Sequence, residues 1–181
     1  MNSLMLSAAF FALFWQGQSQ FFKAPIRRLP PRAFRQLPAA IVESLEGRKC
    51  LVPQTPYIKK PHNVIRGSFT GARRSEWAVL CSRRGTSSIL VFRADSAKLV
   101  AEIAAARDEN YLQDIDGKGT LAFSRVISAV GKDYILEHYE AYGGPKPPPI
   151  THQGIDDGRI ECCSEVWYFY RGKWLKLQGA D

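Results

Sequence analysis

The feature that most constrains this chain is a run between residues 64 and 92 that has the pattern of three short strands joined by two turns. β-Branched and aromatic residues fill its apolar parts, including residues 77–81 and 89–92, and Gly, Ser, Thr and Arg separate them. The turns are too short to hold a crossover helix, so neighbouring strands are expected to pair antiparallel. The pattern therefore predicts an antiparallel meander against which the rest of the chain packs.

Two helices and four more strands are predicted around this meander. One helix is expected over residues 38–46, where Pro38 takes a first-turn position and Leu37, Ile41 and Leu45 share one face. An alanine-rich helix is expected over residues 96–106. Further strands are expected over residues 121–130, 134–139, 160–170 and 173–177. The predicted fold is α+β, a mostly antiparallel, twisted sheet of five to seven strands with two short helices packed on it.

The chain of 181 residues has the length of one domain preceded by an export signal. Residues 1–19 are typical of a signal peptide, because the apolar run 4–15 is shorter than the roughly 20 residues that span a bilayer. Gly17 and Ser19 match a cleavage site; a retained membrane anchor is the alternative. Residues 20–35 are expected to form a basic, proline-containing mobile linker, and residues 36–181 a single α+β domain with no transmembrane segment.

The net charge of +8 is concentrated in that linker. It contains five basic residues and no acid: Lys23, Arg27, Arg28, Arg32 and Arg35. Such a segment attracts anionic partners such as phospholipid, cell-wall polymer or nucleic acid, and the alternative is a solvated, unpaired segment. Specific nucleic-acid recognition is not expected, because no aromatic residues are interleaved with these charges on a folded face. Two further pairs, Arg73-Arg74 and Arg83-Arg84, fall in the two meander turns and are expected at opposite ends of the sheet.

Four cysteines allow three pairings if two disulfides form. Cys162 and Cys163 are neighbours in a predicted strand and should point to opposite faces, so a bond between them is not expected. Cys50 and Cys81 are the favoured pair; the alternative is four buried thiols. There is no C-x-x-C pair and the histidines lie far apart in the sequence, so neither a metal site nor a cofactor is expected.

The most polar cluster beside the predicted core contains His152, Asp156 and Asp157. It would orient a ligand, or supply a catalytic base with two carboxylates nearby. The competing interpretation is an ordinary loop with Asp157-Gly158 as its turn. No residue is assigned a catalytic role.

Residues 67–79 resemble one degenerate repeat of the FG-GAP or VCBS type. In that family, acidic loop residues bind calcium between two strands. Here those positions hold Ser68, Thr70 and Ala72, and only Glu76 keeps a carboxylate, too few charged ligands for calcium. Residues 34–181 also resemble a group of uncharacterised exported bacterial proteins through phrases such as Glu-Trp-Ala-Val-Leu-Cys-Ser-Arg and Tyr-Arg-Gly-Lys-Trp-Leu-Lys-Leu. This resemblance implies one domain and a periplasmic or secreted location, without an activity.

The expected function is that of a non-enzymatic exported binding or interaction module, because no catalytic constellation accompanies the predicted sheet. The alternative is a hydrolase-like enzyme that uses His152 with Asp156 or Asp157. A pocket that joins His152 to other titratable side chains would favour the enzyme. A lone, exposed His152 would favour the binding module.

Overall fold

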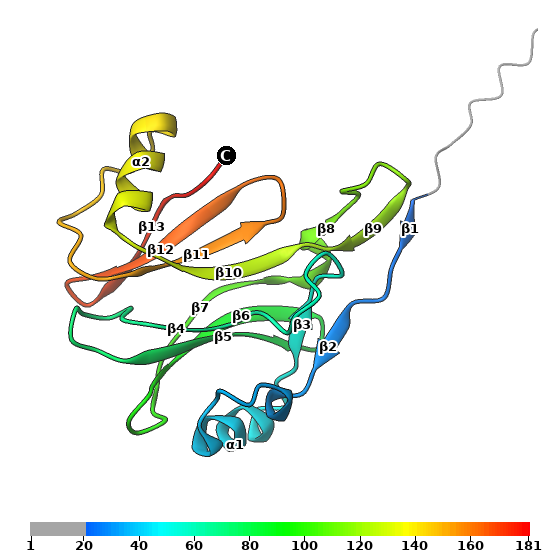
Figure 1. Cartoon of the computed structure of the whole chain (residues 1–181), viewed down its shortest axis with the longest axis horizontal. Helices are drawn as coiled ribbons and strands as arrows, with labels where there is room; N and C mark the ends of the chain where they lie inside the picture. The colour runs from blue at the N-terminus through cyan, green and yellow to red at the C-terminus, as the bar shows by residue number, and fades with distance from the viewer. Residues whose placement is uncertain (1–20) are drawn as a thin grey trace, which may run out of the picture.

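Two four-stranded antiparallel sheets face each other in the computed structural model, which describes residues 21–181, and one helix covers each outer face (Figure 1). The first sheet contains β4 (Val64–Gly67), β5 (Glu76–Arg83), β6 (Thr86–Arg93) and β7 (Leu99–Arg107). The second contains β10 (Arg125–Val130), β11 (Gly154–Arg159), β12 (Ser164–Tyr170) and β13 (Lys173–Gln178). Helix α1 (Ala39–Gly47) packs on the first sheet and α2 (Lys132–Tyr142) on the second.

The predicted meander is confirmed. Strands β4, β5 and β6 pair antiparallel in sequence order, with Trp77 opposite Phe92 and Cys81 opposite Ser88. The α+β class and the mostly antiparallel pairing are confirmed as well, and α1 occupies the position expected for the first helix. Instead of five to seven strands in one sheet, the described residues form thirteen strands in four sheets: the two above and two smaller ones of three and two strands.

Two of the expected elements have the opposite secondary structure. Most of the segment predicted as an alanine-rich helix belongs to β7 instead. The edge of β6 that faces away from β5 offers backbone donors and acceptors, and β7 pairs with this edge along most of the strand. The strand predicted over residues 134–139 lies inside α2. In this helix the rings of Tyr134 and His138, one turn apart, stack with centroids 4.0 Å apart. Ile135 is buried on the side of the helix that packs on the sheet. In both segments tertiary packing outweighs local propensity.

The boundaries of two predicted strands also change. The strand expected over residues 121–130 is interrupted at Ser124 and forms β9 (Thr120–Phe123) and β10. The strand expected from residue 160 begins at Ser164, because residues 160–163 form the turn between β11 and β12. In that turn Cys162 and Cys163 are bonded to each other. The expectation that they point to opposite faces was wrong, since alternation applies only within a strand.

The basic segment is part of the folded domain and not a mobile linker. Strand β1 (Phe22–Lys23) pairs with β9, and β2 (Arg27–Leu29) pairs with β3 (Val52–Gln54). The short 3-10 helix η1 (Pro31–Ala33) follows and brings Phe34 into the core with 1% exposure. The domain therefore begins earlier than residue 36, whereas the predicted signal peptide lies outside the described residues. Within residues 21–181, no helix has the length and apolar character needed to cross a membrane.

Three apolar layers hold the sheets and helices together. The first lies between α1 and the outer face of the first sheet and includes Ile41, Leu45 and Leu90. The second fills the space between the sheets and includes Leu80 and Ile155. The third lies under α2 and includes Ile135, Val166 and Tyr168. Each sheet thus has two covered faces over most of its area, which explains why both faces of β5 and β6 are apolar.

A buried ion pair within the second sheet, Arg125 of β10 with Asp157 of β11, is hydrogen-bonded to the first sheet through its arginine. The Arg125 side chain is 0% exposed and donates two hydrogen bonds to the Asp157 carboxylate, both at 2.7 Å. Its other donors reach the first sheet, at the backbone and side chain of Ser87 on β6 and the carbonyl of Ala104 on β7. Burial alone would lower the pKa of Arg125, but the hydrogen bonds and charge of Asp157 outweigh burial and raise it. All five guanidinium donors are therefore used.

Asn63 joins the sheets at a second point. Its side-chain amide donates to the carbonyl oxygens of Pro53 and Arg125, at 2.8 and 3.1 Å, and its oxygen accepts from the Ile127 amide at 3.0 Å. Asn63 has a φ of 69°, a left-handed conformation that asparagine adopts more readily than most residues. The residue just before β4 is thus held against β10.

Replacing Arg125 with Met should destabilise the fold by about 3–5 kcal/mol, because Asp157 would remain buried without its partner. Urea unfolding at neutral pH measures the change. The matched control is Arg107→Met, which breaks the exposed pair with Glu109 and should alter stability by less than about 1 kcal/mol. Equal effects of the two substitutions would contradict the role assigned to Arg125.

Candidate functional site

The structure does not bring the polar residues His152, Asp156 and Asp157 together as one site. Asp156 and Asp157 are neighbours in β11, so their side chains point to opposite faces of the sheet. Asp157 faces Arg125 between the sheets, and Asp156 accepts a hydrogen bond from Tyr134 Oη at 3.2 Å under α2. No hydrogen bond or ion pair in the described part of the chain connects His152 with either aspartate.

His152 is held by the backbone. Its Nδ1 and Nε2 atoms lie 3.0 Å from the carbonyl oxygens of Gln153 and Phe169, and its ring stacks on Tyr168 at 4.4 Å. Because both ring nitrogens face carbonyl oxygens, neither is placed to take a proton from a substrate. The described residues also contain no cluster of three or more His, Cys, Asp or Glu side chains that could hold a metal ion.

Glu76, the one carboxylate in the segment expected to resemble an FG-GAP repeat, organises the loop between β4 and β5. The carboxylate is fully buried, and it accepts hydrogen bonds from the backbone amides of Phe69 and Thr70 at 2.7 and 2.8 Å. The Thr70 hydroxyl also donates to it, and Arg93 lies 3.6 Å away. This carboxylate therefore stabilises the loop through the chain's own donors.

Basic residues gather at the end of β5 that is far from Glu76, around the turn to β6. A hollow of about 410 Å³ is lined there by Arg48, Lys49, Arg83 and Arg84, with Ser88 and Glu102. Arg83, Ser88 and Glu102 lie on the outer face of the first sheet, beyond the point where α1 ends. The hollow is thus the part of that face which the helix leaves uncovered.

The Cys50–Cys81 disulfide places the two basic pairs side by side. The predicted bond is present, with the two Cα atoms 5.3 Å apart. Next to it, Leu51 and Ser82 exchange two backbone hydrogen bonds of 2.7 and 3.1 Å. Arg48 and Lys49 precede Cys50, and Arg83 and Arg84 follow Cys81, so the same covalent bond draws both pairs to one end of the sheet.

The turn itself exposes Arg84 at its tip. Arg84 and Gly85 have φ values of 51° and 78°, and two successive left-handed residues are typical of a type I′ hairpin turn. Arg83, one residue earlier, forms an ion pair with Glu102, which also accepts a hydrogen bond from Ser88 Oγ at 2.7 Å. Glu102 therefore orients Arg83 along the floor of the hollow, whereas no ion pair in residues 21–181 engages Arg84.

A second hollow of about 410 Å³ lies beside the first and shares Arg84 and Thr86 with it. It adds two basic residues, Arg28 and Arg107. Arg28 donates to the buried Asp108 carboxylate at 2.6 Å, which is also bonded to Ser82 Oγ at 2.5 Å. Together the two hollows are lined by six basic and three acidic residues, and by no aromatic residue.

The sequence prediction located only part of this basic surface. Among the five basic residues proposed to contact an anionic surface, Arg28 lines the second hollow, and the other four are exposed along the segment: Lys23, Arg27, Arg32 and Arg35. The contribution of Arg48 and Lys49 was missed. The signal that would have found them is the cysteine pairing, because a Cys50–Cys81 bond necessarily brings Arg48-Lys49 close to Arg83-Arg84.

The fold and this surface together define an α+β protein with two facing antiparallel sheets and a cationic site at one end of the first sheet. Comparisons with protein-family models, with curated proteins and with solved structures each found no match to the chain. The functional argument therefore proceeds from the contacts and charges of the site itself.

Replacing both cysteines in Cys50→Ala/Cys81→Ala should lower the free energy of unfolding by about 3–4 kcal/mol, because the bond closes a loop across a sequence separation of 31. The matched control is Cys162→Ala/Cys163→Ala, which removes a bond across a separation of 1 and opens no long loop. Urea unfolding of the two variants measures the difference. A loss in the control as large as that in the first variant would show that loop closure is not the cause.

Proposed function

We propose that this chain is an exported, non-enzymatic binding module that holds the phosphate or sulfate groups of a linear anionic polymer in the two hollows around Arg84. The observation that carries the proposal is that two adjacent hollows share Arg84 and Thr86 and have an excess of three positive charges. The disulfide that positions the basic pairs is compatible with an oxidising compartment, where such bonds persist.

The types of side chain favour a tetrahedral oxyanion as the bound group. Four of the six basic residues around the β5–β6 turn belong to the first hollow, and five of the six are arginines. The planar guanidinium presents paired N–H donors that match phosphate and sulfate oxygens, and arginine stays charged at every physiological pH. Thr86 adds a hydroxyl donor to the lining of the first hollow, whereas the Ser88 hydroxyl already donates to Glu102.

The shape of the surface favours a polymer that is recognised through its charges. Two hollows that share a wall would receive successive anionic groups of one chain, with Arg84 between them. Nucleic-acid binding without sequence preference normally adds aromatic side chains on which bases stack. Because neither hollow has an aromatic lining residue, single-stranded nucleic acid is the weaker candidate.

The hydrolase-like alternative receives no support from the geometry of its residues. His152 is engaged by two backbone carbonyls, Asp157 by Arg125, and Asp156 lies on the other face of β11. A base, a carboxylate that orients it and an open position for substrate are not gathered around His152 in residues 21–181. The binding module is therefore the function that we put forward.

Removing two charges at the site should weaken binding of linear polyphosphate and of heparin by about tenfold or more, equivalent to about 1.4 kcal/mol. The variant is Arg48→Gln/Arg84→Asn, in which asparagine tolerates the left-handed turn position. The matched control, Arg73→Gln/Arg74→Gln, removes the same charge from two exposed residues in the β4–β5 turn and should bind like the parent chain. Titration calorimetry at two salt concentrations measures affinity and its salt dependence.

The choice of probe separates the possible sources of the anion. Polyphosphate and heparin compare phosphate with sulfate, and oligothymidylate of similar charge tests single-stranded nucleic acid. Equal losses in the site variant and the control would indicate a diffuse charge effect and contradict a site around Arg84. Preferential binding of oligothymidylate would contradict recognition through charge alone.

A further inference from the structure

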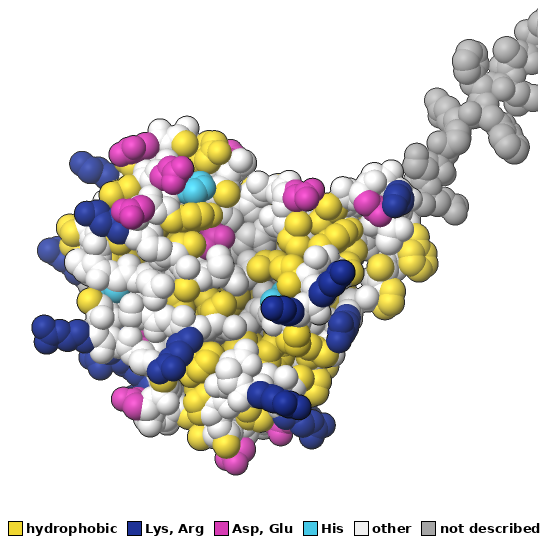
Figure 2. Space-filling view, in the orientation of Figure 1, with side chains coloured by type: hydrophobic (Ala, Val, Ile, Leu, Met, Phe, Trp, Pro, Cys, Tyr) yellow, Lys and Arg dark blue, Asp and Glu magenta, His cyan; other side chains and the backbone are white. Residues whose placement is uncertain are grey.

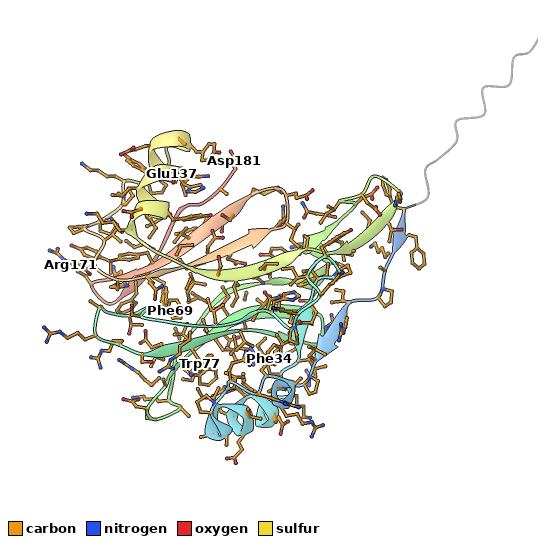
Figure 3. The ribbon with its side chains drawn as sticks, viewed as in Figure 1. Phe34, Phe69, Trp77, Glu137, Arg171 and Asp181 are labelled. Carbon is orange, nitrogen blue, oxygen red and sulfur yellow. A yellow bond between two sulfur atoms is a disulfide. The ribbon has the colours of Figure 1, made fainter. Side chains whose placement is uncertain are left out.

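A separate pocket of about 310 Å³ lies on the second sheet, on the face of β11 opposite the Arg125–Asp157 pair. Its polar wall includes Tyr134 of α2, Asp156 of β11 and Ser164 of β12, and Ser128 and Glu161 also line the pocket. Its apolar wall includes Ile58, Val126 and Ile160, and the bonded Cys162 and Cys163 lie at its edge. Helix α2 carries three acidic residues and one lysine. Figure 2 shows acidic side chains in this region with basic ones beside them, and Figure 3 labels Glu137.

Three oxygen atoms converge on the polar side of this pocket. Tyr134 Oη lies 3.2 Å from Asp156 Oδ1 and 3.4 Å from Ser164 Oγ. The Ala180 amide donates to Ser164 Oγ at 2.8 Å and fixes its position. A Cβ at Gly179 would come within 2.1 Å of the same oxygen, so the C-terminal segment packs too tightly against Ser164 to admit any other residue. The three oxygens, with the Tyr134 hydroxyl donating to Asp156, are thus held in place before any ligand arrives, and each keeps a lone pair that can accept.

Asp156 differs from the buried carboxylates of the domain. Each of those carboxylates has an arginine partner: Glu76 with Arg93 at 3.6 Å, Asp108 with Arg28 at 2.6 Å, and Asp157 with Arg125 at 2.7 Å. Asp156 is half-buried, and no salt bridge in residues 21–181 reaches it; His138 of α2 acts on it only through its charge. Arg159 also lines the pocket, but its guanidinium packs over Tyr111 and donates to the Asn110 carbonyl.

This isolation has an energetic consequence. Burial raises the pKa of the Asp156 carboxyl, so the folded state holds its ionised form less favourably than the unfolded chain does. An acid with a raised pKa in the folded state subtracts stability at pH values above that pKa, and protonation at lower pH restores it. A cation bound beside Asp156 would favour the ionised carboxylate and offset this cost of burial.

We propose that this pocket binds a small organic primary ammonium ion, with its nitrogen on Asp156, Tyr134 and Ser164 and its apolar body against Val126 and Ile160. A primary ammonium has three N–H donors, and the pocket offers three converging oxygen acceptors. The apolar wall would receive a short hydrocarbon chain. This site is distinct from the basic hollows, so the proposal does not depend on the function assigned to them.

The test is a titration of the protein with n-butylamine, which is an ammonium ion at neutral pH. Backbone and side-chain NMR chemical shifts are recorded at each concentration. Saturable shifts at Tyr134, Ser164 and Ala180 are expected at millimolar concentration, the range typical of fragment-sized ligands. Two matched probes, 1-butanol and tetramethylammonium, lack the charge or the N–H donors and should bind at least about tenfold more weakly. Equal binding of butanol and butylamine would overturn the proposal.

Substitutions distinguish a binding role from a structural one. Asp156→Asn should abolish butylamine binding while leaving the melting temperature unchanged or higher, because it removes an unpaired charge. The control Glu137→Gln removes the same charge from an exposed position on α2 and should bind like the parent chain. Parent-like binding by Asp156→Asn would overturn the assignment. A variant that fails to fold would contradict the expectation that Asp156→Asn keeps or raises the melting temperature. The comparison of probes on the parent chain would then still decide the ligand class.

Discussion

The arrangement of this domain depends on one buried residue, Arg125, which pairs with Asp157 and also hydrogen-bonds to the facing sheet. The pair lies within the second sheet, but the remaining guanidinium donors end on Ser87 and Ala104 of the first sheet. Sliding one sheet over the other would leave buried donors unpaired, which is more costly than losing apolar contacts that can be remade. Because a buried pair adds little net stability when intact, its effect is to select one alignment of the sheets.

That alignment determines which surfaces remain open. Helix α1 covers the outer face of the first sheet only as far as Gly47, and the uncovered end becomes the basic hollow. Helix α2 covers the second sheet in the same way and leaves the pocket beside Asp156 at its border. The two candidate sites have opposite charge and lie on different sheets. Each site lies on a part of a sheet that the helix packed on it does not cover, because the helix is shorter than the outer face of that sheet.

Much of the architecture could be predicted from local patterns. The meander, the helix that includes Ile41 and the Cys50–Cys81 bond were foreseen, because each depends on periodicity or on a small number of possible pairings. The segment that forms β7 was expected to be helical, since alanine favours a helix when no partner strand is considered. The residues of β11 were interpreted as a loop, since Asp156, Asp157 and Gly158 are rare in strands. These residues belong to a strand because Arg125 neutralises Asp157 and Gly158 fits closely against Ser164.

The sequence by itself determined the class of fold, the β4–β5–β6 meander of the first sheet and the concentration of positive charge in the basic segment, because these follow from the order and type of neighbouring residues. Only the tertiary structure decided which charges share a site. It separated His152 from the aspartates, paired Asp157 with an arginine 32 residues away, and left Asp156 beside a pocket. The physical reason is that Coulomb interactions and desolvation depend on distance and burial in space. Spacing along the chain does not reveal either quantity until the sheets are packed.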